Sequence, residues 1–193
     1  MCSRVFCLKL LSDKEGDITL IGTIGAFQVL TAKRIMGVFI LCFILNGTYT
    51  TPADIPGKVD KTELKYMAGV IDAENGNMSN DPDMYYNDVL RQLLTGSVVL
   101  NRMYSDKWNG NTIEEVVMAK DGGYIQYATK TRNTFKNRKP SELTKMIAKY
   151  LLLYGPICPP GVVFQGQGKH KTKLYMSIPV KGDKDELFYY GNY

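Results

Sequence analysis

Glu74 lies in "GVIDAENGN", residues 69–77, where an acidic side chain follows apolar residues at helical spacing. At about 100° per residue, Glu74 shares a helix face with Met67 and Ile71. Desolvation and the negative end of a helix both raise the pKa of a carboxyl group. A carboxyl that stays protonated near neutral pH is the general acid that cleavage of a glycosidic bond requires. The alternative interpretation is a structural glutamate bound to a backbone amide or to an arginine such as Arg102.

The histidine count restricts the chemistry further. His170 is the one histidine of the chain, whereas zinc hydrolases use several His or Cys ligands and nucleophilic triads need a His beside the nucleophile. Cys158 precedes His170 by twelve residues but lies in the rigid, turn-like "PICPPG". This composition favours chemistry that carboxylates perform alone, and we expect neither a metal nor a cofactor.

The elements that must position Glu74 begin near residue 60. Asp60 and Glu63 resemble a capping box, and Asn75-Gly76 ends the helix that they start. Further helices are predicted over residues 83–104, 112–120 and 141–154, with Gly96-Ser97 allowing a close helix contact. Strand-like segments follow at 161–165, 173–180 and 186–193, and the last two suit a hairpin. These patterns predict an α+β domain, with a helical body followed by a small C-terminal antiparallel β-sheet.

The first 50 residues differ from this domain. Residues 35–45, "IMGVFILCFIL", are apolar and follow Lys33 and Arg34. Such a segment is short for a membrane-spanning helix but fits the core of an export signal or an anchor. An anchor implies membrane contact through residues 19–45 and a location at the cell envelope; a buried helix of the main domain is the alternative. We therefore divide the chain into an extension (1–50), a linker (51–59) and a main domain (60–193).

The chain carries a formal net charge of +5, with basic residues concentrated at 130–149 and 169–184. Ordinary solvated surface explains such residues, and attraction to anionic cell-wall polymers is the functional alternative. Nucleic-acid binding uses similar charges, but no recognised nucleic-acid-binding motif accompanies them here. We do not expect a nucleic-acid partner.

The order of motifs along the chain carries a resemblance to a known family. "VIDAENGN" is followed by "RQLLTGSVVLNRMYSDKWNGNTIEEVV" and then by "GGYIQYA". This order resembles the catalytic domain of the SleB-type cell-wall hydrolases, the spore-cortex-lytic enzymes and their phage relatives. The family's helix with a Glu, its "VVLNR" helix end, its "NTI..VV" segment and its Gln-aromatic motif match Glu74, residues 98–102, residues 111–117 and Gln126-Tyr127. The resemblance covers about residues 64–191 and continues through "GVVF" and "LFYYG".

The resemblance implies a lysozyme-like fold that cleaves peptidoglycan between N-acetylmuramic acid and N-acetylglucosamine, outside the cell or at its membrane. Glu74 would be the catalytic acid. Gln126 and Tyr127 would line the substrate groove, with Gln165 and Tyr189 as further substrate-binding residues. Asn101, at the end of "VVLN", is expected to give structural support, with a hydrogen bond to the Glu74 turn as the functional alternative.

The chain departs from the family in three places. Asn77 stands where the family carries a second Glu, and "MSNDPDMYYN" lengthens the turn after the first helix. The closing His-x-Phe-Tyr pattern lacks its His, since Asp185 or Glu186 occupies that region. These differences leave the acid in place and affect the substrate subsites.

The reaction type follows from the number of carboxylates. Standard glycosidases use two, and no second carboxylate is tied to Glu74 by a motif. One acid suffices if the substrate supplies the nucleophile, and the family resemblance favours a lytic transglycosylase, in which the muramic acid 6-hydroxyl attacks, over a hydrolysing muramidase. A muramidase would draw its second carboxylate first from Asp81, Asp83 or Asp88. The competing hypothesis is a non-catalytic envelope or virion component with a lysozyme-like fold.

Overall fold

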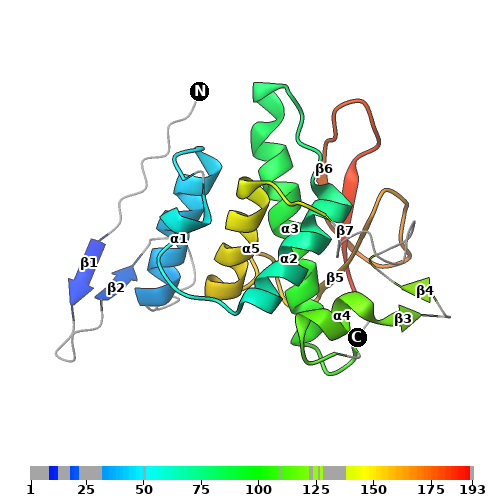
Figure 1. Ribbon diagram of the computed structural model, residues 1–193, viewed down its shortest axis with the longest axis horizontal. Helices are drawn as coiled ribbons and strands as arrows, with labels where there is room; N and C mark the ends of the chain where they lie inside the picture. Colours follow the sequence, from blue (N-terminus) through cyan, green and yellow to red (C-terminus); the bar gives the residue numbers. More distant parts are fainter. Residues whose placement is uncertain are drawn as a thin grey trace.

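The computed structural model describes residues 9–12, 18–21, 32–49, 51–108, 110–121, 124–125, 127 and 138–191. Its side chains are described over 36–49, 51–108, 110–119, 127 and 138–191. A helical body is followed by a small antiparallel sheet, so the fold is α+β as predicted (Figure 1). In chain order the elements are β1 (Lys9–Ser12), β2 (Ile18–Ile21), α1 (Ala32–Leu45), η1 (Pro52–Asp54), α2 (Lys61–Asn75), η2 (Pro82–Met84), α3 (Tyr85–Met103), α4 (Ile113–Met118), β3 (Lys120–Asp121), β4 (Tyr124–Ile125), α5 (Glu142–Tyr154), β5 (Val162–Gly166), β6 (Leu174–Ile178) and β7 (Glu186–Tyr190).

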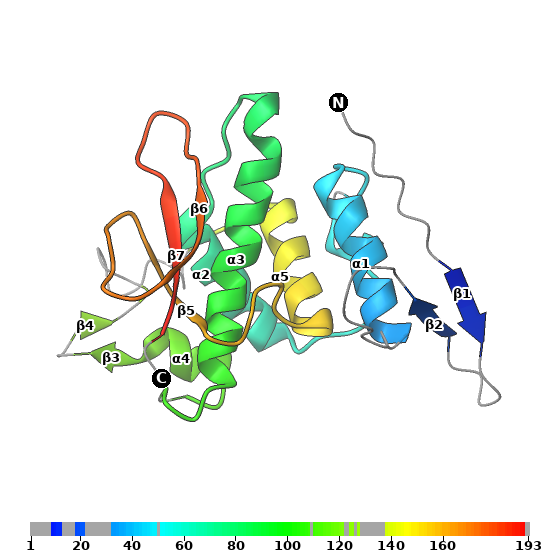
Figure 2. The ribbon, with the colours of Figure 1, turned by 180° about the vertical axis from the view of Figure 1, so that it is seen from behind.

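Three helices, α2, α3 and α5, form the centre of the body (Figure 1 and Figure 2). Gly96 of α3 lies where they meet, and a methyl group added there would overlap Leu151 of α5 and Ile71 of α2. The missing side chain therefore lets α3 approach both neighbours, as the Gly96-Ser97 pair predicts. The apolar side chains of the three helices then close a single core.

Side-chain caps start the helices where the sequence predicts them. Asp60 accepts hydrogen bonds from the backbone amides of Thr62 and Glu63 at 2.8 and 3.0 Å, and α2 begins there. Thr112 and Ser141 cap α4 and α5 in the same way. Each cap contributes about 1 kcal/mol to helix stability. The start of α2 is thus fixed, and the helix carries Glu74 to its other end.

The C-terminal sheet has the strand order β5-β7-β6, with both pairs antiparallel. The predicted β6–β7 hairpin is confirmed, and β5 pairs on the other side of β7. Side chains alternate along β7, so Glu186 and Phe188 face one side while Leu187 and Tyr189 face the other. Phe188 is fully buried in the core, which places the Glu186 side of β7 against the helices.

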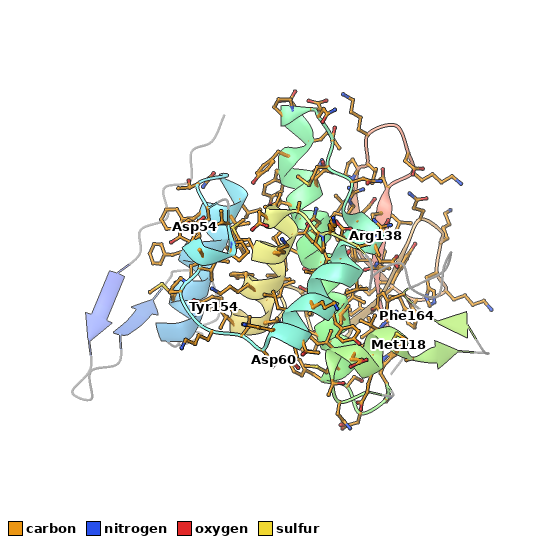
Figure 3. The ribbon with its side chains drawn as sticks, in the orientation of Figure 1. Asp54, Asp60, Met118, Arg138, Tyr154 and Phe164 are labelled. Carbon is orange, nitrogen blue, oxygen red and sulfur yellow. The ribbon has the colours of Figure 1, made fainter. Side chains whose placement is uncertain are left out.

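The apolar segment at 35–45 is a helix that packs on the main domain. Ile40 and Ile44 of α1 are 1% and 0% exposed and belong to the common core. A methyl group added at Gly37 would come within 3.1 Å of the ring of Tyr154, a residue of α5 that Figure 3 labels. One face of α1 is therefore packed on the domain, whereas Met36, Val38, Phe39 and Phe43 of the same helix are exposed. No helix in the described ranges is long and apolar enough to cross a membrane.

The expected linker at 51–59 is also packed against the domain. Ile55 is fully buried. Lys149 of α5 donates hydrogen bonds to the carbonyl oxygens of Pro52 and Ile55 at 2.9 and 2.6 Å. The polar and Pro-containing composition that predicted a linker produces instead a short 3₁₀ turn, Pro52–Asp54, fixed by these contacts.

The loop between α2 and α3 is held by a buried polar group that we call the Asp88 cluster, formed by Asn77, Ser79, Asp88 and Arg91. Asp88 and Arg91 form an ion pair at 3.1 Å, with side chains 3% and 8% exposed. Asp88 also accepts from the backbone amide of Ser79 at 2.6 Å, and Arg91 donates to the carbonyl oxygen of Asn77 at 2.8 Å. These hydrogen bonds fix Asn77 and Ser79, the first residues of the lengthened turn.

Candidate active site

Glu74 lies in the last turn of α2, one residue before the helix ends. Met67 and Ile71 are fully buried, as the helical spacing predicts, but Glu74 itself is exposed to solvent. The polar side chain that enters the core here is its neighbour Asn75, whose Nδ2 donates to Thr95 Oγ1 at 2.6 Å. Glu74 therefore lies at the edge of the core, as predicted, with its side chain open to solvent while its neighbours Ala73 and Asn75 pack inward.

The Glu74 carboxyl is nevertheless surrounded by protein on most sides. Desolvation by this surrounding protein raises its pKa to about 7, and the charge of Glu186 raises it further. The charges of Arg102 and Arg138 and a hydrogen bond from Gln165 act in the opposite direction. The predicted direction of the shift is confirmed, and its main cause is the one expected. Glu74 thus combines accessibility to solvent with a proton retained near neutral pH.

Gln165 brings the sheet to Glu74. It lies on β5, opposite Phe188 of β7, and therefore on the helix-facing side of the sheet. Its side-chain amide donates toward Glu74, which leaves its Oε1 buried and without a hydrogen-bond partner among the described residues. An unpaired buried acceptor costs about 1–3 kcal/mol unless a ligand or water pairs with it. Gln165, predicted as substrate-binding, is therefore adjacent to the predicted acid.

Tyr127 and Arg102 lie on a second side of Glu74. Tyr127 is 2% exposed, its ring lies 4.7 Å from the Arg102 guanidinium, and its hydroxyl has no hydrogen-bond partner among the described residues. Burial raises the pKa of Tyr127 to about 12, and the nearby Glu74 charge contributes. Its hydroxyl therefore stays a donor at all physiological pH values. Arg102 is fixed by its hydrogen bond to the Val163 carbonyl at 2.7 Å.

Glu186 is the residue that the sequence interpretation missed. It is 8% exposed at the start of β7, and its charge acts on Glu74. The segment Glu186-Leu187-Phe188-Tyr189 has the spacing of the family's closing His-x-Phe-Tyr pattern, with Glu186 at the place of the His. That spacing was the available signal. We call Glu74, Gln165, Tyr127, Arg102 and Glu186 the Glu74 site.

The other predicted residues lie elsewhere or outside the described residues. Gln126 lies outside them. Tyr189 is 5% exposed on the sheet side opposite Glu186, with its ring centre 5.7 Å from that of His170, and its hydroxyl donates to the Gly168 carbonyl at 3.3 Å. Tyr189 pairs across the sheet with Phe164, whose ring lies 5.9 Å from the Arg102 guanidinium, and it is not among the groups that shift the pKa of Glu74.

Asn101 supports the turn that leads into β5 and not the turn that follows Glu74. Its Nδ2 donates to the carbonyl oxygens of Pro159 and Val162 at 2.7 and 3.0 Å, so it fixes the entry to β5. The expected structural role is confirmed, whereas the alternative hydrogen bond to the Glu74 turn is not formed. Asn101 thereby positions the strand that carries Gln165.

The three aspartates proposed as a second carboxylate lie in the α2–α3 loop and the first turn of α3. Asp81 caps η2 and pairs with Lys181 of the β6–β7 hairpin at 2.9 Å. Asp83 is exposed within η2, and Asp88 belongs to the Asp88 cluster. None of the three is among the charges that shift the pKa of Glu74.

No protein-family model, curated protein or solved structure matches this chain.

The functional groups of the Glu74 site indicate the chemistry that it can perform. It offers one accessible acid, one buried carboxylate, a phenol donor and an amide acceptor. Within the described residues, no three His, Cys, Asp or Glu side chains converge as metal ligands would. The arrangement suits proton transfer to a neutral polar substrate that carries hydrogen-bonding groups.

Proposed function

We propose that this protein cleaves the glycan strands of peptidoglycan between N-acetylmuramic acid and N-acetylglucosamine, with Glu74 as the general acid. One observation carries the proposal: a solvent-accessible carboxyl whose pKa is raised to about 7. Protonation of a glycosidic oxygen needs an acid that holds its proton near neutral pH and reaches the substrate. The motif order from Glu74 to Gln126-Tyr127, which resembles the SleB-type hydrolases, supports the same reaction.

The surroundings of Glu74 support a lysozyme-like arrangement. The acid ends a helix and faces a small antiparallel sheet through Gln165. The buried hydroxyl of Tyr127 and the Oε1 of Gln165 lack partners among the described residues, and an N-acetyl group supplies one acceptor and one donor for such atoms. Both atoms are closed to solvent here, and we propose that they pair with an N-acetyl group when a bound glycan moves the side chains that cover them.

The reaction that we favour is lytic transglycosylation. Glu74 protonates the leaving oxygen O4, and the C1–O4 bond breaks. The oxygen of the muramic acid 6-hydroxyl then forms the new bond to C1, and the ionised Glu74 accepts the proton of that hydroxyl. The nucleophile is already tethered to the sugar, so no activated water is needed. Glu186 is 8% exposed and therefore poorly placed to activate water on the substrate.

A muralytic assay with matched variants tests the proposed function. Purified peptidoglycan is incubated with the parent, with Glu74→Gln and with Glu63→Gln, which makes the same change in the first turn of the same helix. We expect Glu74→Gln to lose about 10²–10⁴-fold in rate and Glu63→Gln to match the parent. Equal clearing by Glu74→Gln and the parent would reject the proposal.

The same assay separates the second candidate, a non-catalytic envelope or virion component. Such a protein binds peptidoglycan without releasing fragments, and its Glu74→Gln variant binds as the parent does. Mass spectrometry of released fragments then identifies the product. A 1,6-anhydro-muramic acid end is lighter than a hydrolysed end by one water, and reducing ends would favour a muramidase.

A further inference from the structure

Glu186 is an unusual carboxylate for its position. It is 8% exposed at the first residue of the central strand β7, paired across the sheet with Ile178. Acidic side chains are rarely this buried unless they are paired. Among the described residues, none forms a hydrogen bond or a close ion pair with its carboxylate. Its charge therefore acts on neighbouring charged groups, Arg91 of α3 among them, without a direct bond.

The strand register directs Glu186 towards the acid. Glu186 and Phe188 face the same side of β7, and Phe188 lies opposite Gln165 of β5. Gln165 and Glu186 are thus diagonal neighbours on one sheet face, a separation of roughly 7–8 Å. Since the Gln165 amide donates toward Glu74, the three side chains form one cluster between the sheet and the end of α2.

We propose that Glu186 is a positioning residue of this site, whose carboxylate, fixed on β7, acts on the glycan reaction through Glu74. The inference rests on the proposed function. The burial of Glu186 separates its role from that of Glu74, which is open to solvent. A glycan reaches Glu74 directly, whereas Glu186 reaches the reaction by its charge.

The charges around the two carboxylates divide their roles. Arg102 of α3, Arg138 before α5 and the Gln165 amide favour the ionised form of Glu74, while burial and the Glu186 charge favour its protonated form. Burial raises the pKa of Glu186 above its ordinary value, the charge of Asp183 in the hairpin adds to this rise, and the charge of Arg91 of α3 acts against it.

Arg91 opposes the effect of burial on Glu186, and the negative charge of Glu186 favours the protonated form of Glu74. A negative charge near a carboxyl group disfavours its ionisation. If the Glu186 charge is removed, the pKa of Glu74 falls. Glu74 then loses its proton at a lower pH, and the alkaline limb of the cleavage profile moves to lower pH.

The test is the pH profile of cleavage by Glu186→Gln, with Asp185→Asn as the matched control. Asp185 is the adjacent exposed carboxylate, hydrogen-bonded to Ser177 at 2.7 Å. We expect Glu186→Gln to move the alkaline limb to lower pH, with a larger loss at about pH 8 than at about pH 5, and Asp185→Asn to keep the parent profile. Glu186→Asp keeps the negative charge, so the alkaline limb of its profile should lie close to that of the parent. A uniform loss at all pH values would show a structural role and overturn the inference.

Two further readouts keep this result separate from the proposed function. An NMR titration of Glu74 in Glu186→Gln needs no activity, and an unchanged Glu74 pKa overturns the inference. Should Glu186→Gln fail to fold, Glu186→Met removes the charge while keeping a side chain of similar length, and an unchanged Glu74 pKa in that variant also overturns the inference. An inactive Glu74→Gln beside an unshifted Glu186→Gln profile rejects only the role of Glu186. An active Glu74→Gln rejects the proposed function itself.

Discussion

The Asp88 cluster and the Glu74 site lie close to the α2–α3 loop, and they differ in how many of their buried polar atoms have a hydrogen-bond partner. In the Asp88 cluster, each oxygen and nitrogen that fixes the loop has a partner between 2.6 and 3.1 Å, and Arg91 Nε alone is unpaired among the described residues. In the Glu74 site, Tyr127 OH and Gln165 Oε1 lack partners there. Satisfied buried groups rigidify a fold, whereas unsatisfied ones in a native structure need a reason. The contrast shows how the first cluster holds the loop, and it supports the proposal that the second binds a substrate.

The largest effect on stability should come from the Asp88 cluster. Asp88→Ala leaves the buried Arg91 guanidinium without its carboxylate and frees the Ser79 amide. Breaking a buried ion pair in this way costs about 3–5 kcal/mol in the free energy of unfolding, measured by urea denaturation. Asp83→Ala, in the exposed part of the same loop, should change it by less than about 0.5 kcal/mol. A stable Asp88→Ala protein would remove the structural half of the contrast.

Asn75 follows Glu74 on α2, but its side chain is buried and hydrogen-bonded within the protein. Its Nδ2 donates to Thr95 Oγ1 inside the core. Asn75→Ala leaves Thr95 without this donor, and we expect a loss of about 1–3 kcal/mol in thermal or urea unfolding. Cleavage at a temperature where the variant is folded should be close to the parent's. A large loss of activity without a loss of stability would place Asn75 in the Glu74 site.

Tyr127→Phe removes an unpaired buried hydroxyl. Stability should stay within about 1 kcal/mol of the parent or rise, because no hydrogen bond among the described residues is lost. Cleavage should weaken, with a rise of KM, because the substrate loses a donor. Calorimetry and steady-state kinetics measure the two quantities. A clear loss of stability would show that the hydroxyl is paired within the protein.

A stability effect with a distinctive sign belongs to Glu74 itself. Its pKa is about 7 in the folded protein and near 4.5, the ordinary value for a glutamate, in the unfolded chain. Below about pH 4.5 both states hold the proton, so Glu74 costs nothing; as pH rises to 7, the unfolded state loses the proton first and the fold is destabilised. Glu74→Gln should therefore melt above the parent at pH values above 7 and match it below 4.5. A variant that melts lower above pH 7 would show that the charge stabilises the fold.

The sequence predicts the helices and strands better than it predicts the burial of the site. Caps at Asp60, Thr112 and Ser141 and the apolar spacing of α2, α3 and α5 are local signals, and the structure follows them. The pairing of β5 with β7 is a long-range event, so the approach of Gln165 and Glu186 to Glu74 is not contained in any local pattern.

The N-terminal segment shows the same limit. Residues 35–45 have the apolar composition of a signal or an anchor, yet Ile40 and Ile44 are buried against the domain. Composition does not distinguish an apolar helix that faces lipid from one that faces a core, because both bury the same side chains. The contact between Gly37 and Tyr154 shows which face of this helix packs on the domain, and only the folded structure contains it.

The central claim is that Glu74 keeps its proton near neutral pH while open to a substrate. An NMR titration of side-chain carboxyl carbons, with Glu74→Gln to assign the Glu74 signal, tests it most directly. The account predicts a midpoint of about 7 for Glu74. A midpoint at or below about 4.3, the value of a free glutamate, would contradict it.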